Sequence, residues 1–308
     1  MRNTCLNEVY RLAKENKNIL FIGSDLGAGT LAPMKDEMPD RFIMEGISEQ
    51  HIIGMSAGLA MEGFIPYVNS IAPFLTRRCY EQVLVDLCLH DLPVRLIGNG
   101  GGVVYAPLGP THLSIEDIAI LRVIPNMTIV APCDAQEMLR LMPKTVDWPH
   151  PLYIRLAKGG DKVVSRNDLG FEIGKAILMK SPKDGLFITT GVMTQKAMEA
   201  AKQLSEEGIE CGVLHMHTIK PLDHKALKEF IPQVEAVVTV EEHFRTGGLG
   251  SAILESCSDL MPEHVAKISR VGIHDQFPNK YGSQETLLEY LGITTKSIKN
   301  AMRTKLKQ

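Results

Sequence analysis

The chain has 308 residues, which is more than one average hydrophobic core accommodates and about right for two domains. Its formal net charge is −3, and its hydrophobic and charged fractions, 44% and 22%, are ordinary for a soluble globular protein. Because the chain carries no excess of positive charge, we expect neither nucleic acid nor an acidic membrane surface as a partner.

Six cysteines are scattered along the chain, mostly within apolar runs, and none forms a Cys-x-x-Cys pair. We therefore expect reduced thiols in the core of a cytoplasmic protein. The chain opens with Met1 to Thr4, which lead into an amphipathic helix and not into the apolar core of a signal peptide. No apolar run is long enough to cross a bilayer.

The first half of the chain alternates between predicted helices and short apolar strands. Helices are expected at residues 6–14, 77–89 and 135–145. Buried strands are expected at residues 19–23, 65–68, 94–98, 127–131 and 152–156. This alternation is typical of an α/β domain with a mostly parallel sheet.

The polar, turn-rich stretch at residues 158–168 is predicted to be a linker between domains at residues 1–165 and 172–308. In the second domain, strands are expected at residues 185–191, 211–216, 236–242 and 266–272. Helices are expected at residues 194–206, after the glycine-bearing loop 243–251, and twice near the end of the chain. The predicted fold class is therefore α/β, with two domains that each contain a mostly parallel sheet flanked by helices.

The most informative stretch runs from Arg41 to Ala60. It predicts a short extended segment, a turn at Gly46, and a helix that Ser48 can cap. The helix is apolar enough to be buried, so the carboxylate of Glu49 in its first turn is costly unless it has a pairing group or a functional role. On residue type alone, pairing with the helix N-terminus is the simpler explanation, since that end favours negative charge.

The sequence Gly-Ile-Ser-Glu-Gln-His, followed by Ile-Gly-Met-Ser-Ala-Gly-Leu-Ala, resembles the pyrimidine-binding domain of thiamine diphosphate enzymes. The most similar members are transketolase, 1-deoxyxylulose-5-phosphate synthase and the β subunit of 2-oxoacid dehydrogenases. The resemblance implies that Glu49 is catalytic: it would bind N1′ of the aminopyrimidine and favour the imino tautomer that deprotonates thiazolium C2. Residues 219–223 and 240–251 resemble the C-terminal domain of the same enzymes, so the match spans essentially the whole chain.

The resemblance implies further cofactor contacts in loops that follow strand ends, where parallel sheets bind ligands. Phe74 matches the aromatic residue that stacks on the aminopyrimidine, and a plain core phenylalanine is the alternative. Tyr80 is a second ring within range, with a core position as its alternative. Ser24 and Asp25 match polar contacts to the cofactor or substrate.

The resemblance also implies substrate-binding residues. Asn99 and His112 stand at the two ends of a loop that resembles the substrate loop of transketolase, and His112 would reach substrate hydroxyls or the carbonyl as a second catalytic residue. Arg77 would face the substrate. Arg155 matches an arginine that holds a substrate phosphate, with a salt bridge at the strand end as the alternative. Leu108 stands where the family has an aspartate, so we do not expect the usual sugar specificity.

The resembling enzymes bind Mg²⁺ with the cofactor diphosphate through a Gly-Asp-Gly motif followed at a distance by asparagine, and this sequence has no such motif. We therefore expect no metal ligand from this chain. The resemblance implies the C-terminal, or β, subunit of a split transketolase. An N-terminal partner subunit would supply the diphosphate-binding domain and Mg²⁺, within an α2β2 heterotetramer built on a β homodimer.

The expected reaction is two-carbon ketol transfer between phosphorylated sugars, with the thiamine cofactor carrying the difficult chemistry. The β subunit of a 2-oxoacid dehydrogenase and a deoxyxylulose-phosphate-synthase-like enzyme are the alternatives within thiamine chemistry. A non-catalytic scaffold subunit is the alternative from another class. The joint presence of Glu49, Phe74, His112 and Arg155 argues against a scaffold, and Gly-Pro-Thr-His favours transketolase. The donor and acceptor sugars stay open.

Overall fold

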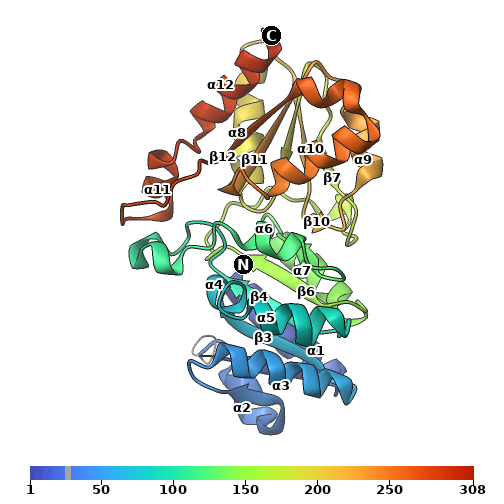
Figure 1. Ribbon diagram of the computed structural model, residues 1–308, viewed down its shortest axis with the longest axis vertical. Helices are drawn as coiled ribbons and strands as arrows, with labels where there is room; N and C mark the ends of the chain where they lie inside the picture. Colours follow the sequence, from blue (N-terminus) through green and yellow to red (C-terminus); the bar gives the residue numbers. More distant parts are fainter. Residues whose placement is uncertain (25–28) are drawn as a thin grey trace.

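The protein is described by a computed structural model that places residues 1–24 and 29–308. Two sheets flanked by helices lie one above the other in Figure 1, with the N-terminal half below and most of the C-terminal half above. The sheets have seven and five strands, and most of their neighbouring strands are parallel. The predicted α/β class is therefore confirmed.

The seven-stranded sheet has the order β10-β5-β6-β4-β3-β1-β2, and all pairs among β1 to β6 are parallel. Its strands are β1 Ile19–Gly23, β2 Phe42–Met44, β3 Ile65–Ile71, β4 Arg95–Asn99, β5 Thr128–Val130, β6 Leu152–Leu156 and β10 Thr218–Lys220. Every residue of β1, β4 and β6 is buried, as expected for central parallel strands covered on both faces.

Helices cover the faces of this sheet. They are α1 Arg2–Glu15, α2 Ala32–Glu37, α3 Glu49–Met61, α4 Ala72–Leu75, α5 Tyr80–Gln82, the π-helical turn Val83–Leu89, α6 Asp117–Arg122 and α7 Ala135–Val146. The helix predicted at 77–89 begins only at Tyr80, because the chain first turns at Thr76, where the amide N–H of Arg78 donates to the carbonyl of Pro73. That turn brings Arg78 to the start of α3, where it pairs with Glu49.

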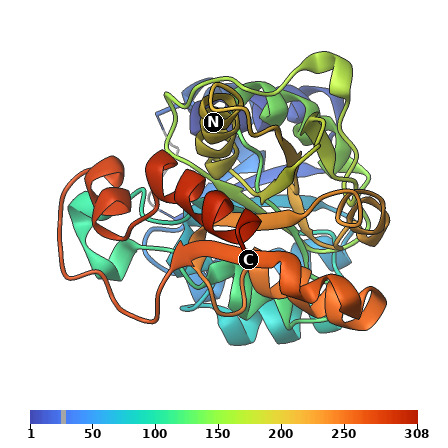
Figure 2. The same ribbon diagram turned by 90° about the horizontal axis from the view of Figure 1, so that it is seen from above.

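The five-stranded sheet has the order β12-β11-β8-β9-β7. Its strands are β7 Ile177–Lys180, β8 Gly185–Thr189, β9 Cys211–His215, β11 Ala236–Phe244 and β12 Ile268–Ile273. Its helices are α8 Met193–Ser205, α9 His224–Phe230, α10 Leu249–Leu260, α11 Gln284–Tyr290 and α12 Thr295–Leu306. β7 is antiparallel to β9, and the other neighbours are parallel. Figure 2, which looks down from above, shows α11 at one edge of the molecule and α12 running from there toward the middle of the view, where the C-terminus lies.

Strand β10 comes from the second half of the chain but belongs to the first sheet, where it pairs antiparallel with β5. The amide of Ala131, just beyond β5, also donates to the carbonyl of His217 at 2.7 Å. We did not predict β7 or β10 from the sequence, and these strands are only four and three residues long. As a result, the two sheets do not divide the chain cleanly at the predicted boundary.

A buried polar pair links the two domains. Glu137 on α7 and His215 on β9 are fully buried, and their Oε2 and Nε2 atoms lie 2.9 Å apart. The amide of Cys133 donates to the same carboxylate oxygen at 2.6 Å. Burial raises the pKa of Glu137, but its pairing with His215 outweighs burial and lowers the pKa to about 2.

The six cysteines are free and buried, which confirms the prediction of reduced core thiols. Burial raises the pKa of each thiol, which keeps it protonated. Within the described residues, no helix combines the length and the apolar character needed to cross a membrane.

We expect Glu137→Gln to lower the free energy of unfolding by about 2–3 kcal/mol, because it removes the charge of a fully buried pair. Urea unfolding at neutral pH measures this as a lower midpoint. Glu206→Gln, at an exposed position after α8, is the matched control and should change stability by less than about 0.5 kcal/mol. Equal midpoints for the two variants would show that the pair contributes nothing to domain docking.

Candidate active site

Glu49 is the first residue of α3 and is only 2% exposed. Its Oε1 atom accepts hydrogen bonds from the hydroxyls of Ser24, at 3.0 Å, and Ser70, at 3.3 Å. Its Oε2 atom accepts from the guanidinium of Arg78 at 2.7 Å. The helix thus begins where the sequence predicted, with Ser48 at its N-cap position, but the Ser48 hydroxyl makes no capping hydrogen bond and donates to the carbonyl of Glu45.

The donors around Glu49 keep its carboxyl ionised. Burial raises the pKa of Glu49, but hydrogen bonds from Arg78, from its own backbone amide and from Ser24 together outweigh burial and lower the pKa. The carboxylate is therefore buried, charged at neutral pH, and fixed in position from two sides.

An aromatic ring lies beside this carboxylate. Phe74 on α4 is half-buried, and the guanidinium carbon of Arg78 lies 3.9 Å from its ring centroid. The imidazole of His112 meets the same ring edge-on, at 5.3 Å between centroids. The structure therefore brings together Glu49, Phe74 and His112, and adds Arg78, which we did not predict from the sequence. The one available signal was the arginine pair that directly follows the Phe74 segment.

The polar residues of the site follow the carboxyl ends of neighbouring strands. Ser24 follows β1, Ser70 lies near the end of β3, and Asn99 ends β4. The side-chain amide of Asn99 donates to the carbonyl of Ser70 at 2.9 Å, which supports the strand that carries a Glu49 donor. Asp25 lies outside the described residues. The side chain of Tyr80 packs against the core beneath the site, and its predicted cofactor contact stays a prediction.

Arg77 supports the loop that carries His112. Its guanidinium donates to the carbonyls of Thr111, at 2.5 Å, and Leu113, at 3.2 Å, and pairs with the carboxylate of Glu116 at 2.5 Å. These contacts connect the segment after Phe74 to the predicted substrate loop. The substrate contact that we predicted for Arg77 stays a prediction, as does that of Asn99.

Arg155 on β6 is 7% exposed and forms a buried ion pair with Asp117, with Nε and Oδ2 separated by 2.7 Å. Its guanidinium also donates to the backbone carbonyls of Ser114 and Glu242, at 2.9 and 3.0 Å. These contacts favour the salt bridge at the strand end, which was the alternative interpretation of the sequence. The predicted phosphate-binding role stays a prediction.

One cluster among the described residues places enough ligand atoms together for a metal ion: Cys133, Glu137 and His215, all buried. Glu137 and His215 form the domain-linking pair described above, and the amide of Cys133 donates to that pair. Mg²⁺ prefers oxygen ligands to sulfur and imidazole nitrogen. The cluster therefore does not fit the magnesium ion that the sequence resemblance implies.

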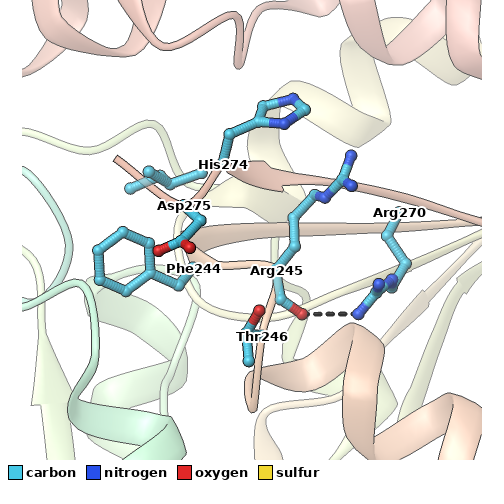
Figure 3. A pocket seen from close by; sticks show the side chains of 7 residues that line it. Phe244, Arg245, Thr246, Arg270, His274 and Asp275 are labelled. Carbon is cyan, nitrogen blue, oxygen red and sulfur yellow. Dashed lines mark hydrogen bonds between the residues drawn. The ribbon is translucent and has the colours of Figure 1, made fainter. Parts of the chain in front are cut away.

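A cavity of about 450 Å³ lies in the second domain, near the ends of β11 and β12 (Figure 3). It is lined by Phe244, Arg245, Thr246, Arg270, Ile273, His274 and Asp275. Arg270 donates to the carbonyl of Arg245 at 2.7 Å, as the dashed line in Figure 3 shows. None of the residues that surround Glu49 lines this cavity, so it is not part of the candidate active site.

Two family models match the chain. The model of the transketolase pyrimidine binding domain matches residues 1–160, and the model of the transketolase C-terminal domain matches residues 174–298. The first contains Glu49, its three hydrogen-bond donors and Phe74. The chain therefore belongs to the transketolase family.

Its relatives include separate subunits. The chain is 36% identical to a subunit of the apulose-4-phosphate transketolase of Phocaeicola vulgatus, over 94% of this chain and 92% of that one. It is 34% identical to a subunit of the 6-deoxy-6-sulfo-D-fructose transketolase of a Clostridium species, over 98% and 92%. It is also 35% identical to the 1-deoxy-D-xylulose-5-phosphate synthase of Trichormus variabilis, over 94% of this chain but only 46% of that protein.

Among solved structures, the chain resembles one described as a split gene transketolase, an inactive β4 tetramer. The TM-score is 0.91 at 34% identity, and the match covers 99% of this chain and 98% of that one. The two relatives of matching length named above are transketolase subunits, whereas the synthase is about twice as long.

We expect Arg155→Ala to lower the free energy of unfolding by about 3–5 kcal/mol, because it leaves the fully buried Asp117 carboxylate without its cation. Arg166→Ala, which breaks an exposed pair with Asp168, is the matched control and should cost less than about 1 kcal/mol. Chemical unfolding measures both. A stable Arg155→Ala variant that loses affinity only for phosphorylated substrates would restore the phosphate-binding role instead.

Proposed function

We propose that this chain is the β subunit of a split transketolase that transfers a two-carbon ketol unit between phosphorylated sugars, using thiamine diphosphate. The observation that carries the proposal is the buried, ionised carboxylate of Glu49 beside the face of Phe74, within a transketolase pyrimidine-binding domain. A site of this kind holds a flat heteroaromatic ring by its edge and by its face.

The residues present fit the aminopyrimidine ring of the cofactor. The guanidinium of Arg78, which is itself flat and carries N–H donors, already lies over Phe74 while it donates to Glu49. A planar group can therefore meet both residues at once. The cofactor's diphosphate and Mg²⁺ have no comparable set of ligands among the described residues, where the one metal-like cluster contains cysteine and histidine.

Thiamine diphosphate, when bound, supplies the nucleophilic carbon that attacks the sugar carbonyl. Glu49 holds a proton at N1′ of the aminopyrimidine, and the hydroxyls of Ser24 and Ser70 orient its carboxylate. Phe74 fixes the plane of the ring. In our proposal, His112 donates a hydrogen bond to a substrate oxygen, and its edge-on contact with Phe74 supports a position beside the ring.

A partner subunit completes this site in our proposal. It supplies the diphosphate-binding domain and the Mg²⁺ ligands within an α2β2 heterotetramer in the cytoplasm. Support comes from the relatives that are named as subunits and match this chain over nearly their full length. Exposed apolar side chains near the site and its loop also suit coverage by a partner, namely Ile47, Leu108 and Tyr281.

The substrate is a sugar with an anionic group at one end. The relatives named above are transketolase subunits for apulose 4-phosphate and for 6-deoxy-6-sulfo-D-fructose, and both names describe anionic sugars. Leu108 is half-exposed in the loop before His112 and cannot accept a hydrogen bond from a substrate hydroxyl. A panel that includes phosphorylated and sulfonated ketoses therefore tests specificity best.

We expect the purified chain to be inactive alone, even with thiamine diphosphate and Mg²⁺, and to gain ketol transfer activity when combined with an N-terminal transketolase subunit from the same genome. Transfer between ketose and aldose phosphates measures activity, and the N-terminal subunit alone is the control. Turnover by this chain alone would contradict the split-enzyme proposal.

We expect Glu49→Gln to slow hydrogen–deuterium exchange at thiazolium C2 in the assembled complex by about 10²–10⁴, the usual contribution of a positioned acid–base group. Glutamine keeps the size of the side chain but cannot share a proton with N1′. Glu62→Gln, at the exposed end of the same helix, is the matched control and should exchange like the wild type. If both variants exchange at the wild-type rate, Glu49 has only a structural role.

A further inference from the structure

The guanidinium of Arg78 makes both of the contacts that the proposed function reserves for the cofactor's pyrimidine ring. It donates to Oε2 of Glu49 at 2.7 Å, and its carbon lies 3.9 Å from the centroid of Phe74. The second distance is a stacking distance, so no further ring fits between the guanidinium and the phenyl face. Arg78 and an aminopyrimidine stacked on the same face of Phe74 therefore exclude one another.

We infer that Arg78 is a placeholder for the aminopyrimidine: it fills the ring site in the free chain and must swing out before the cofactor binds. The inference rests on the proposed function, and it adds a gating residue to that site. The guanidinium suits this task because it is flat, is positively charged, and presents N–H donors along its edge, as the bound ring presents its own edge to a carboxylate.

The structure shows why Arg78 can leave while Glu49 stays. The side chain of Arg78 is 39% exposed, whereas that of Glu49 is 2% exposed. The backbone of Arg78 is held at both ends of its residue, since its amide donates to the carbonyl of Pro73 and its carbonyl accepts from the side chain of Gln50. Rotation about side-chain bonds alone can thus carry the guanidinium into water.

The exchange also alters the surroundings of Glu49. Once Arg78 has swung out, the carboxylate keeps its hydrogen bonds from the hydroxyls of Ser24 and Ser70, and both of these go to Oε1. Oε2 can then accept the edge of the ring. The placeholder therefore keeps the carboxylate paired until the cofactor binds, and its departure exposes the atom that the ring needs.

The placeholder weakens cofactor binding, because only the fraction of molecules in which Arg78 has already left the site can bind the ring. A partly exposed ion pair and one cation–π contact together correspond to about a 5- to 30-fold effect on affinity. We therefore expect Arg78→Ala to bind the ring about 5 to 30 times more tightly than the wild-type chain.

The test is calorimetric titration of the purified chain with thiamine and with 4-amino-5-hydroxymethyl-2-methylpyrimidine, the neutral ring alone. The neutral probe matters because thiamine is a cation and gains affinity when any nearby arginine is removed. Arg77→Ala is the matched control for that effect, since the guanidinium of Arg77 is directed to Glu116 and to the loop that carries His112. Arg78→Lys, which can pair with Glu49 but cannot lie flat on Phe74, should be intermediate.

Tighter binding by Arg78→Ala, absent from Arg77→Ala and lost in the double variant Arg78→Ala/Glu49→Gln, supports the placeholder. Equal, weaker or undetectable binding by Arg78→Ala overturns it, and weaker binding would make Arg78 a cofactor ligand. Failure of the proposed function looks different: ring binding would then be unaffected by Glu49→Gln and by Phe74→Ala in the wild-type background. Thermal unfolding of each variant shows whether it is folded before titration.

Discussion

A carboxylate taken out of water must have donors or a cation around it at all times, and the site around Glu49 is built on this constraint. Its oxygens accept hydrogen bonds from Ser24, Ser70 and Arg78. Ser24 directly follows β1, and Ser70 lies on the neighbouring parallel strand β3; the amide of Ser24 continues the ladder between these strands by donating to the carbonyl of Asn69. The register between β1 and β3 therefore sets the positions of the two hydroxyls that stabilise the Glu49 carboxylate at the start of α3.

Contacts from the second domain fix the position of the predicted substrate loop, which belongs to the first domain. Both domains therefore contribute to the candidate site. The amide of Val103 donates to the carboxylate of Glu242 on β11 at 2.8 Å. Gly102 has a φ of 72°, and a Cβ at that position would lie 2.3 Å from the carboxyl carbon of Glu242. Only glycine permits this approach, which places the loop after β4 against the second domain. The loop that carries His112 thus depends on contacts that form only when both domains dock.

The sequence predicted the central strands well because each is a short apolar run bounded by polar turns, and burial on both faces requires that pattern. The short strands β7 and β10 escaped prediction because three or four residues carry no clear periodicity. β7 is positioned by antiparallel pairing with β9. β10 is positioned by antiparallel pairing with β5, which is distant from it in the sequence. Long-range pairing of this kind is decided by packing and not by local propensity.

The sequence also predicted that Glu49, Phe74 and His112 lie together, and the contacts through Arg78 and between the rings of Phe74 and His112 agree with that prediction. The sequence could not show which arginine pairs with which carboxylate. Arg77 and Arg78 are neighbours of the same type, and only the turn between α4 and α5 directs Arg78 toward Glu49 and Arg77 toward Glu116. A ligand-binding motif contains the residues that contact the ligand. The Glu49 carboxylate is also buried when no ligand is bound, so the free chain needs a further group to pair with it. The group that stabilises the site of the free chain lies outside the motif, and its role is visible only in three dimensions.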